Sequence, residues 1–421
     1  MRRSIALHIF PCVALIILVL VLAGCAPAGG QATGTGNNQP SQARHIVVSY
    51  CGTDRTVSTT SAAPQTPQPA VYAGTNDVFG ANLYAFDAHT GAVRWCDHIE
   101  EAGVTLAKCV RSCPGPPLTF VGKPVISKNV LYVCAGAYDS YTLAFNASNG
   151  LARWQTMTDC QGNLSPVEGD YETPAVENNI VYAGTYALRA SDGSVLWRFH
   201  LKAIFGPTVV NGIVFAYSNY IVYALNATNG EPLWHFQTHE PLGDAPTASS
   251  DTVYFGTISN KSSSDSNVAC DFFALNVLNG SQRWCSHTGG IDGSLATISQ
   301  GSVYIGSDEL FAFDASTGKL NWRYAVGTTI QSMPEIAGNV VYVSADGTYA
   351  LNATAGTLLW HNTLGAGEAT SFESSVTAYG LVFVRKNDGK GDSIIYALQA
   401  SNGKVEWQSQ TIHQASALTV V

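Results

Sequence analysis

The sequence has few charged residues and no long apolar segment. Only 12% of its 421 residues are charged, and acidic residues outnumber Lys and Arg by 30 to 21. An acidic chain repels phosphate backbones, so we expect no nucleic acid among its partners. The most apolar segment, Val13–Leu22, is too short for a membrane-spanning helix.

Familiar catalytic patterns are also absent from the sequence. It has no serine, histidine and aspartate at triad spacing, no nucleophile elbow and no phosphate-binding glycine loop. Its many Asn-Gly and Thr-Gly pairs are typical of hairpin turns instead. We therefore expect no catalytic residue.

The N-terminus has the features of an export signal. Arg2 and Arg3 precede the apolar segment, and Leu22-Ala23-Gly24-Cys25 ends it. These four residues resemble the bacterial lipobox, in which the cysteine becomes the lipid-bearing first residue. The resemblance implies that residues 1–24 are removed and that lipid on Cys25 anchors the protein to a membrane.

The segment after the cleavage point is expected to be a flexible tether. Residues 25–69 are rich in Gly, Ser, Thr, Gln, Asn and Pro, and within them only His45–Cys51 has the composition of a strand, an isolated one. Removal of residues 1–24 takes away two arginines and no acid. The net charge of the mature chain therefore changes from −9 to −11.

All eight tryptophans end copies of one eleven-residue phrase. In each copy a Gly lies four positions before the Trp and an Ala ten positions before it, as in AFDAHTGAVRW and ALNATNGEPLW. A fixed repeat of this kind indicates stacked supersecondary units rather than separate domains. The tryptophans are Trp95, Trp154, Trp197, Trp234, Trp284, Trp322, Trp360 and Trp407.

Each repeat supplies four short strands, which we call A to D. In several repeats strand A follows a Pro, as at Pro174-Ala175, and strand B contains a Val-Tyr pair, as at Val181-Tyr182. Strands C and D come from the phrase, joined at its Asx-rich, Gly-ended turn. Four antiparallel strands repeated eight times predict an all-β, eight-bladed β-propeller over residues 70–421.

The two ends of the predicted propeller complement each other. The first repeat starts at strand B, with Val71-Tyr72, and the chain ends with one extra strand A, Ser416–Val421. We therefore expect the C-terminal strand to complete the first blade and close the ring, which satisfies the open edges. Each Trp is expected to fill the wedge between neighbouring sheets.

The phrase Ala-x-Asx-Ala-x-x-Gly-x-x-x-Trp resembles the tryptophan-docking motif of PQQ-type propellers, the quinoprotein family. The resemblance covers about residues 70–421 and implies the eight-bladed fold. Dehydrogenases of that family use PQQ and calcium and carry an adjacent Cys-Cys disulfide, whereas this sequence has no Cys-Cys pair. A PQQ- and calcium-dependent dehydrogenase is therefore the alternative function, and we expect no cofactor.

In size and anchoring the chain more closely resembles the propeller lipoprotein of the outer-membrane β-barrel assembly machine. That likeness implies a non-catalytic, monomeric scaffold that binds an extracytoplasmic protein partner. The expected place is the outer face of the cell membrane or envelope, and the outer membrane only where the organism has one. A ligand-sensing surface lipoprotein is a further alternative.

Unequal spacing between repeats places the extra residues on one face. Residues 95–124 and 154–174 lengthen D–A loops, whereas residues 246–274 and 385–392 lengthen B–C loops. In a four-stranded meander these two kinds of loop lie on the same face. We expect a partner to bind there, because binding concentrates on elaborated loops of a rigid scaffold; neutral variation of surface loops is the alternative.

Eight cysteines remain beyond the export signal and the lipid site, and an even number suggests disulfides. Cys270 and Cys285 flank the C–D hairpin of the fifth repeat, so we expect them to form a cross-strand disulfide. Cys109, Cys113, Cys134 and Cys160 lie in or beside the first two long loops and suggest a disulfide cluster. A Cys-x3-Cys metal site is the weaker alternative. The pairing stays open for Cys51, Cys96, Cys109, Cys113, Cys134 and Cys160.

Three histidines occupy one repeated position. His98, His200 and His287 each lie three residues after a Trp. Because they belong to the outer strands of three different blades, they would lie far apart around the ring. We therefore expect surface or strand-end histidines here and no shared metal site.

Overall fold

The computed structural model describes eleven stretches of the chain. They are residues 46–50, 68–77, 81–101, 119–136, 140–160, 173–200, 205–258, 270–288, 296–330, 332–365 and 371–421. The predicted export signal, Cys25 and most of the predicted tether lie outside them. Residues 44–421 form one compact unit. Among the described stretches, no helix has the length and apolar character needed to cross a membrane.

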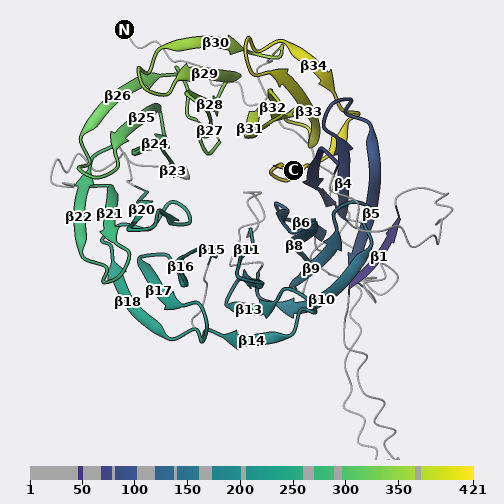
Figure 1. Cartoon of the computed structure of the whole chain (residues 1–421). Coiled ribbons are helices and arrows are strands. Elements are labelled where there is room, and N and C mark those ends of the chain that lie inside the picture. Colours follow the sequence, from purple (N-terminus) through teal and green to yellow (C-terminus); the bar gives the residue numbers. More distant parts are fainter. Residues whose placement is uncertain are drawn as a thin grey trace, which may run out of the picture. The chain divides into compact units, whose positions relative to one another are not determined.

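Eight antiparallel sheets follow one another around a ring, so the predicted all-β, eight-bladed propeller is confirmed (Figure 1). In every blade strand A lies innermost and strand D of the phrase lies toward the outside. Blades 3 to 5 contain β11 (Ala175–Glu177), β12 (Ile180–Ala183), β13 (Tyr186–Arg189), β14 (Val195–Arg198), β15 (Phe205–Val210), β16 (Ile213–Ser218), β17 (Ile221–Asn226), β18 (Pro232–Gln237), β19 (Thr247–Ala248), β20 (Thr252–Gly256), β21 (Phe272–Asn276) and β22 (Gln282–Ser286). Blades 6 and 7 contain β23 (Ala296–Ser299), β24 (Ser302–Gly306), β25 (Glu309–Asp314), β26 (Leu320–Ala325), β27 (Glu335–Ala337), β28 (Val340–Ser344), β29 (Thr348–Asn352) and β30 (Leu358–Asn362).

Blades 8, 1 and 2 carry additional strands. Blade 8 contains β31 (Ser371–Ala378), β32 (Leu381–Asn387), β33 (Asp392–Gln399) and β34 (Val405–Gln408), with β35 (Ile412–His413) added to β33. Blade 1 contains β36 (Thr419–Val420), β2 (Ala70–Gly74), β4 (Ala81–Asp87) and β5 (Val93–Glu101), with β1 (Ile46–Tyr50) outside β5. Blade 2 contains β7 (Val125–Ser127), β8 (Val130–Gly136), β9 (Ser140–Asn146) and β10 (Ala152–Thr158), and β6 (Thr119–Val121) joins it to β3 (Asn76–Asp77) of the first repeat.

The repeated phrase builds strands C and D and the tight turn between them. In blade 4, Asn226 Oδ1 accepts the backbone N–H of Thr228 at 2.8 Å and so caps the turn. Gly230 has a φ of +74°, which glycine adopts without steric cost. A β-bulge after Ala224 then brings Trp234 opposite that alanine in the ladder. These three local preferences explain why the phrase recurs in nearly the same form.

Every Trp docks on the next blade around the ring. Each indole N–H donates to a backbone carbonyl in the phrase of the next blade, at 2.8–3.1 Å. The accepting residue lies seven positions before the Trp that ends that next phrase. The phrase glycine supports this contact, since a Cβ on Gly230 would lie 2.6 Å from the ring of Trp197. The acceptors are Ala147, Ala190, Ala227, Val277, Ala315, Ala353, Ala400 and Ala88. The tryptophans therefore pack between neighbouring blades, as predicted, and each one is also hydrogen-bonded to the next blade.

The tyrosine of strand B donates to the same carbonyl in six blades. In blade 6, for example, the Tyr304 hydroxyl lies 3.2 Å from Ala353 O, which also accepts the indole N–H of Trp322 at 2.9 Å. Burial raises the pKa of Tyr72 to about 12, so its phenol remains a neutral donor. Blades 4 and 8 have Phe215 and Phe383 in this place, and their carbonyl acceptors receive no such bond.

The C-terminus closes the ring, as predicted. Strand β36 pairs with β2 through Tyr72↔Thr419 and Val71↔Val420. Leu418 is fully buried just before it. The indole N–H of Trp407, in the last blade, donates to Ala88 O of the first blade at 2.9 Å, across 319 positions of sequence. Closure therefore uses the same docking bond as the other seven interfaces.

The predicted tether contains one ordered strand that is not isolated. Residues 46–50 form β1, which pairs antiparallel with β5 along its whole length, from Ile46↔Glu101 to Tyr50↔Asp97. Figure 1 shows β1 on the outer side of blade 1. The extended apolar segment IVVSY finds a ladder partner because β5 presents an open outer edge. The strand expected at His45–Cys51 is therefore present, but it is paired with blade 1 and is not isolated.

Deletion of residues 416–421 should destabilise the whole propeller. The free energy of unfolding should fall by at least about 3 kcal/mol, the usual cost of losing one buried leucine, because Leu418 and the β36 ladder are lost together. Urea unfolding of the truncated and full-length proteins measures this. Equal unfolding midpoints would contradict the closure role of the C-terminus.

Replacing Trp by Phe should cost more in blade 4 than in blade 6. Both Trp234 and Trp322 are half-buried, but only Ala353 O, the acceptor of Trp322, keeps a second donor in Tyr304. Trp234→Phe leaves Val277 O without its indole donor, a loss worth about 1–3 kcal/mol. Thermal and urea unfolding of the two variants checks the difference, and the double variant Trp322→Phe/Tyr304→Phe should remove it.

Candidate interaction face

The loops of the propeller separate into two faces. The backbone carbonyl of Thr185, in the B–C turn of blade 3, accepts the N–H of Phe199, at the start of a D–A connection, at 2.8 Å. On the other side Ala147, in a C–D turn, donates its N–H to Asn129 O in an A–B turn. We call the face formed by the B–C and D–A connections the insertion face. Most of the inserted residues, 102–118, 161–172 and 259–269, lie outside the described stretches.

Apart from β1, which lies along the outer edge of blade 1, the described additions to the four-stranded pattern also occur on the insertion face. Strand β3 follows strand B of blade 1 and crosses to β6 of blade 2, with Asn76↔Phe120 and Asp77↔Thr119 as partners. Strand β35 pairs with the beginning of β33, at the B–C end of blade 8. The insertion predicted at residues 385–392 is not a plain loop, because it includes the lengthened ends of β32 and β33. The elaborated face is thus partly built from ordered strands.

The lengthened hairpin of blade 8 is held from both sides. Arg385 is 4% exposed and donates from its guanidinium to Ala415 O, next to the closing strand. Lys386 Nζ donates to Leu364 O at 2.8 Å, where the chain leaves blade 7. The turn between the two strands, with Lys390, is exposed. A rigidly based, exposed hairpin of this kind suits recognition of a partner.

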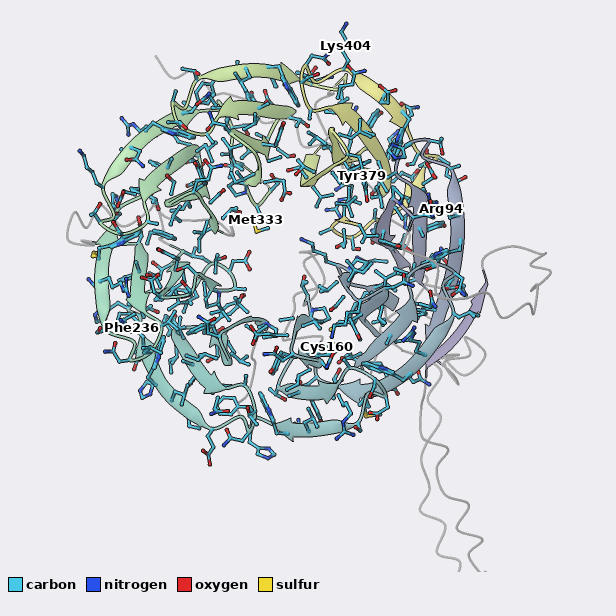
Figure 2. All side chains as sticks on the ribbon, viewed as in Figure 1. Arg94, Cys160, Phe236, Met333, Tyr379 and Lys404 are labelled. Carbon is cyan, nitrogen blue, oxygen red and sulfur yellow. A yellow bond between two sulfur atoms is a disulfide. The ribbon has the colours of Figure 1, made fainter. Side chains whose placement is uncertain are left out.

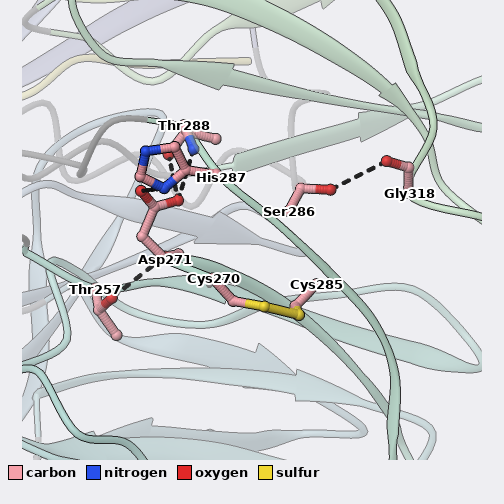
Figure 3. Close-up of a disulfide and its surroundings, with 8 residues drawn as sticks. All are labelled: Thr257, Cys270, Asp271, Cys285, Ser286, His287, Thr288 and Gly318. Carbon is pink, nitrogen blue, oxygen red and sulfur yellow. Dashed lines mark hydrogen bonds and ion pairs between the residues drawn. A yellow bond between two sulfur atoms is a disulfide. The ribbon is translucent and has the colours of Figure 1, made fainter. Parts of the chain in front are cut away.

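The base of the blade 5 insertion is cross-linked, as Figure 3 shows. Cys270 and Cys285 form a disulfide with a Cα–Cα distance of 5.6 Å, the pairing expected across this hairpin. Asp271 is fully buried and accepts the N–H of Thr288 at 2.6 Å and its hydroxyl at 2.9 Å. The ring of His287 lies 2.9 Å from the same carboxylate. These contacts hold the second end of the insertion, and the N–H of Thr257, at the first end, donates to Asp271 O at 2.8 Å.

The three repeated histidines have separate surroundings. His98 Nδ1 lies 2.9 Å from Asn82 Oδ1 on blade 1, and the exposed His287 contacts buried Asp271 on blade 5. His200 is exposed after the outer strand of blade 3. The structure does not bring these side chains together. Within the stretches that the structure describes, no three His, Cys, Asp or Glu side chains are grouped to hold a metal ion.

The expected disulfide cluster near the first two long loops is wrong for Cys160. Its thiol is buried and free, and it donates to Tyr141 O at 3.6 Å. The side chain of Cys160, labelled in Figure 2, packs with Phe120 of β6 and with Ala183 of blade 3. Cys96 is disulfide-bonded. Cys51, Cys109 and Cys113 lie outside the described residues.

A small hollow lies between blades 3 and 4. Its walls include Tyr182, Tyr186, Trp197 and Phe199 of blade 3 and Val214 of blade 4. The cavity volume is about 10 Å³, close to the minimum for one water molecule. This hollow therefore suits a water and not an organic ligand.

The innermost strands are joined to each other by side-chain hydrogen bonds. The hydroxyls of four threonines at one repeated position donate to a backbone carbonyl at or just before the start of strand A in the next blade. In blade 7 this position holds Glu335, whose carboxylate accepts the hydroxyl of Thr377 at 2.9 Å. Burial raises the pKa of Glu335, although the bonds from Thr377 and the charge of Lys123 act in the opposite direction. The threonines are Thr208, Thr247, Thr297 and Thr419.

A family model described as outer membrane protein assembly factor BamB matches three overlapping segments, residues 49–185, 171–289 and 273–419. The chain belongs to this family. The matched segments start within β1 and end in β36, so they include all eight blades. A search of curated proteins finds no match to the chain.

Solved structures share the fold of this BamB-family chain. Dihydro-heme d1 dehydrogenase NirN in complex with DHE is 9% identical over 85% of this chain and 76% of its own, with a TM-score of 0.60. Quinohemoprotein alcohol dehydrogenase from Comamonas testosteroni is 15% identical over 70% of this chain and 68% of its own, with a TM-score of 0.53. BamB from Moraxella catarrhalis is 16% identical over 89% of this chain and 92% of its own, with a TM-score of 0.44. Likeness at these identities concerns the fold alone.

Among the residues that the structure describes, the repeated strand A position does not offer the ligand set of a calcium-bound quinone. Calcium takes six to eight oxygen ligands, several of them carboxylates. At the repeated strand A position the chain offers the carboxylate of Glu335, which is already bonded to Thr377, and threonine hydroxyls that donate to neighbouring blades. These polar groups serve the contacts between blades.

Replacing Glu335 by Gln should change how stability depends on pH. Because the folded-state pKa is raised above the unfolded value, the parent protein loses stability as the pH rises through that interval. The variant lacks this loss and still accepts a bond from Thr377. Its free energy of unfolding, relative to the parent, should therefore increase from about pH 4 to about pH 8. Urea unfolding at both pH values measures it, and a pH-independent difference would contradict the assignment.

Proposed function

We propose that this chain is a non-catalytic, lipid-anchored propeller that binds a protein partner at the cell envelope. The observation that carries the proposal is the match of the BamB family model from the start of the first blade to the closing strand. That family is described as an outer membrane protein assembly factor, and a binding scaffold would suit such a role.

The geometry of the insertion face supports a scaffold. Its additions rest on rigid bases: the disulfide of Cys270 and Cys285 under one insertion, and the contacts of Arg385 and Lys386 under the blade 8 hairpin. Loops fixed at both ends lose less conformational entropy on binding, so they recognise partners more tightly. The opposite face is occupied by the docking turns, whose conformation the tryptophans dictate.

The lipid anchor of the proposal comes from the N-terminal sequence. Leu22-Ala23-Gly24-Cys25 matches the lipobox pattern, and the chain from there to β1 is polar and small in side chain. One diacylated cysteine would hold the propeller at a membrane surface outside the cytoplasm. The membrane is the outer one only if the organism has two.

A PQQ- and calcium-dependent dehydrogenase is the second candidate. It is favoured by the likeness to quinohemoprotein alcohol dehydrogenase at a TM-score of 0.53. The bonded state of Glu335 and of the inner threonines argues against it. Thermal unfolding with and without PQQ and calcium separates the two functions: the scaffold predicts an unchanged melting temperature, and a saturable rise would favour the dehydrogenase.

Photo-crosslinking tests the scaffold directly. A photoreactive amino acid placed at Lys390 lies on the insertion face, and one placed at Lys404 lies in the C–D turn of the same blade on the opposite face. Both lysines are exposed, so the pair is matched in blade, charge and exposure. In intact cells, position 390 should give a discrete crosslinked protein and position 404 should not.

The crosslink should disappear when untagged protein is overproduced, since the partner is then shared. Equal crosslinking from both positions, or from Lys404 alone, would show that the insertion face is not the binding face. Recovery of Cys25→Ser protein in the soluble fraction, against membrane recovery of the parent, tests the anchor separately.

A further inference from the structure

Strand β1 sets the point at which the N-terminal segment joins the propeller. Without it, the polar N-terminal segment would join the blades at Ala70, the first residue of β2. Strand B runs from the face of the docking turns toward the insertion face, as the bond from Ala88 N to Pro69 O beside Ala70 shows. The tether would then arrive at the docking-turn face.

The register of β1 reverses this arrangement. Strand β5 runs from the C–D turn, at Val93, to the insertion face, at Glu101. Strand β1 is antiparallel to it, and its first residue, Ile46, pairs with Glu101. The chain therefore enters blade 1 at the insertion face and reaches Tyr50, opposite Asp97, only afterwards.

The point of entry also shortens the stretch of sequence between the proposed lipid site and the propeller. Between Cys25 and Ile46 there are 20 residues, compared with 44 between Cys25 and Ala70. A flexible chain of 20 residues has a root-mean-square span of about 25 Å, and one of 44 residues about 35 Å. The shorter connection restricts the orientations that an anchored propeller samples.

We infer that β1 is an orienting strap, which holds the insertion face of the propeller toward the membrane. The inference rests on the proposed lipid anchor at Cys25 and names the partner class: a protein embedded in the membrane or lying at its surface. Such a partner is within reach of the insertion face when the tether is short. It is screened from the docking-turn face, which the strap turns away from the lipid.

The strap should be stable enough for this role but easy to disable. Its ladder runs over five residue pairs, and successive N–H groups of a strand point to opposite edges. The double variant Val47→Pro/Val48→Pro therefore removes a ladder bond whichever edge faces β5. Gln42→Pro, ahead of the strand, is the matched control for a change in the tether alone.

Resonance energy transfer to the membrane measures the orientation. Lys390→Cys and Lys404→Cys, each labelled with a donor dye, report the two faces of blade 8, next to blade 1. The full-length lipidated chain is placed in vesicles of phosphatidylcholine and phosphatidylglycerol with acceptor dye on a fraction of the headgroups. Transfer should be higher from position 390 than from position 404, and the same in the Gln42→Pro control.

The double proline variant should lose or reverse the difference between the two positions, because its chain then joins the blades at Ala70 on the docking-turn face, while its propeller still melts as the parent does. Higher or equal transfer from position 404 in the parent would overturn the inference. So would an unchanged difference in the double proline variant.

A second arm separates this inference from the lipid anchor. The mature chain with an N-terminal hexahistidine tag in place of the lipid is bound to vesicles that contain a nickel-chelating lipid. A difference between positions 390 and 404 in this arm supports the strap even when Cys25 carries no lipid in cells. Absence of the difference here overturns the strap, whatever anchors the natural chain.

Discussion

The indole N–H bond from one blade to the turn of the next is the interaction on which the rest of the structure depends. It occurs at all eight interfaces, and at the last of them it joins Trp407 to Ala88 and so closes the ring. The bond buries a large ring against a glycine and satisfies a carbonyl that a tight turn leaves open. Without it, neighbouring sheets would keep apolar contacts, which do not specify an angle between blades, and the bonds of the strand B tyrosines and innermost threonines, which occur at only some of the described interfaces.

This bond also explains why the two faces of the propeller differ. The acceptor carbonyl, the phrase glycine and the Asx cap all lie in the C–D turn, so a longer turn would displace the docking surface of the preceding Trp. The B–C and D–A connections do not form the docking surface for a Trp, so they can lengthen without disturbing the contact between blades. Strands β3, β6 and β35, the cross-linked base at Cys270 and the blade 8 hairpin with Arg385 accordingly occur on that side. A surface for partners is thus a by-product of how the blades dock.

Much of this could be predicted from residue patterns, and the failures have definite causes. The disulfide of Cys270 and Cys285 was predictable because one hairpin brings both residues together. The free state of Cys160 was not predictable, because the residues that bury its thiol come from strands far apart in sequence. The role of the strand B tyrosines, such as Tyr304, was missed although they recur in the repeat. Their hydroxyls act in the next blade, which periodicity alone does not reveal.

The sequence by itself determined the fold class, the number of blades, the closure of the ring and the face that carries the insertions, because each follows from a local phrase repeated at measurable spacing. Only the tertiary structure decided what the phrase residues touch and where the N-terminal segment attaches. The segment Ile46–Tyr50 carries no repeat signal, and its partner β5 offers backbone groups rather than a matching side-chain pattern. Ladder pairing depends on an edge being open in space, and no count of residues along the chain shows which edge that is.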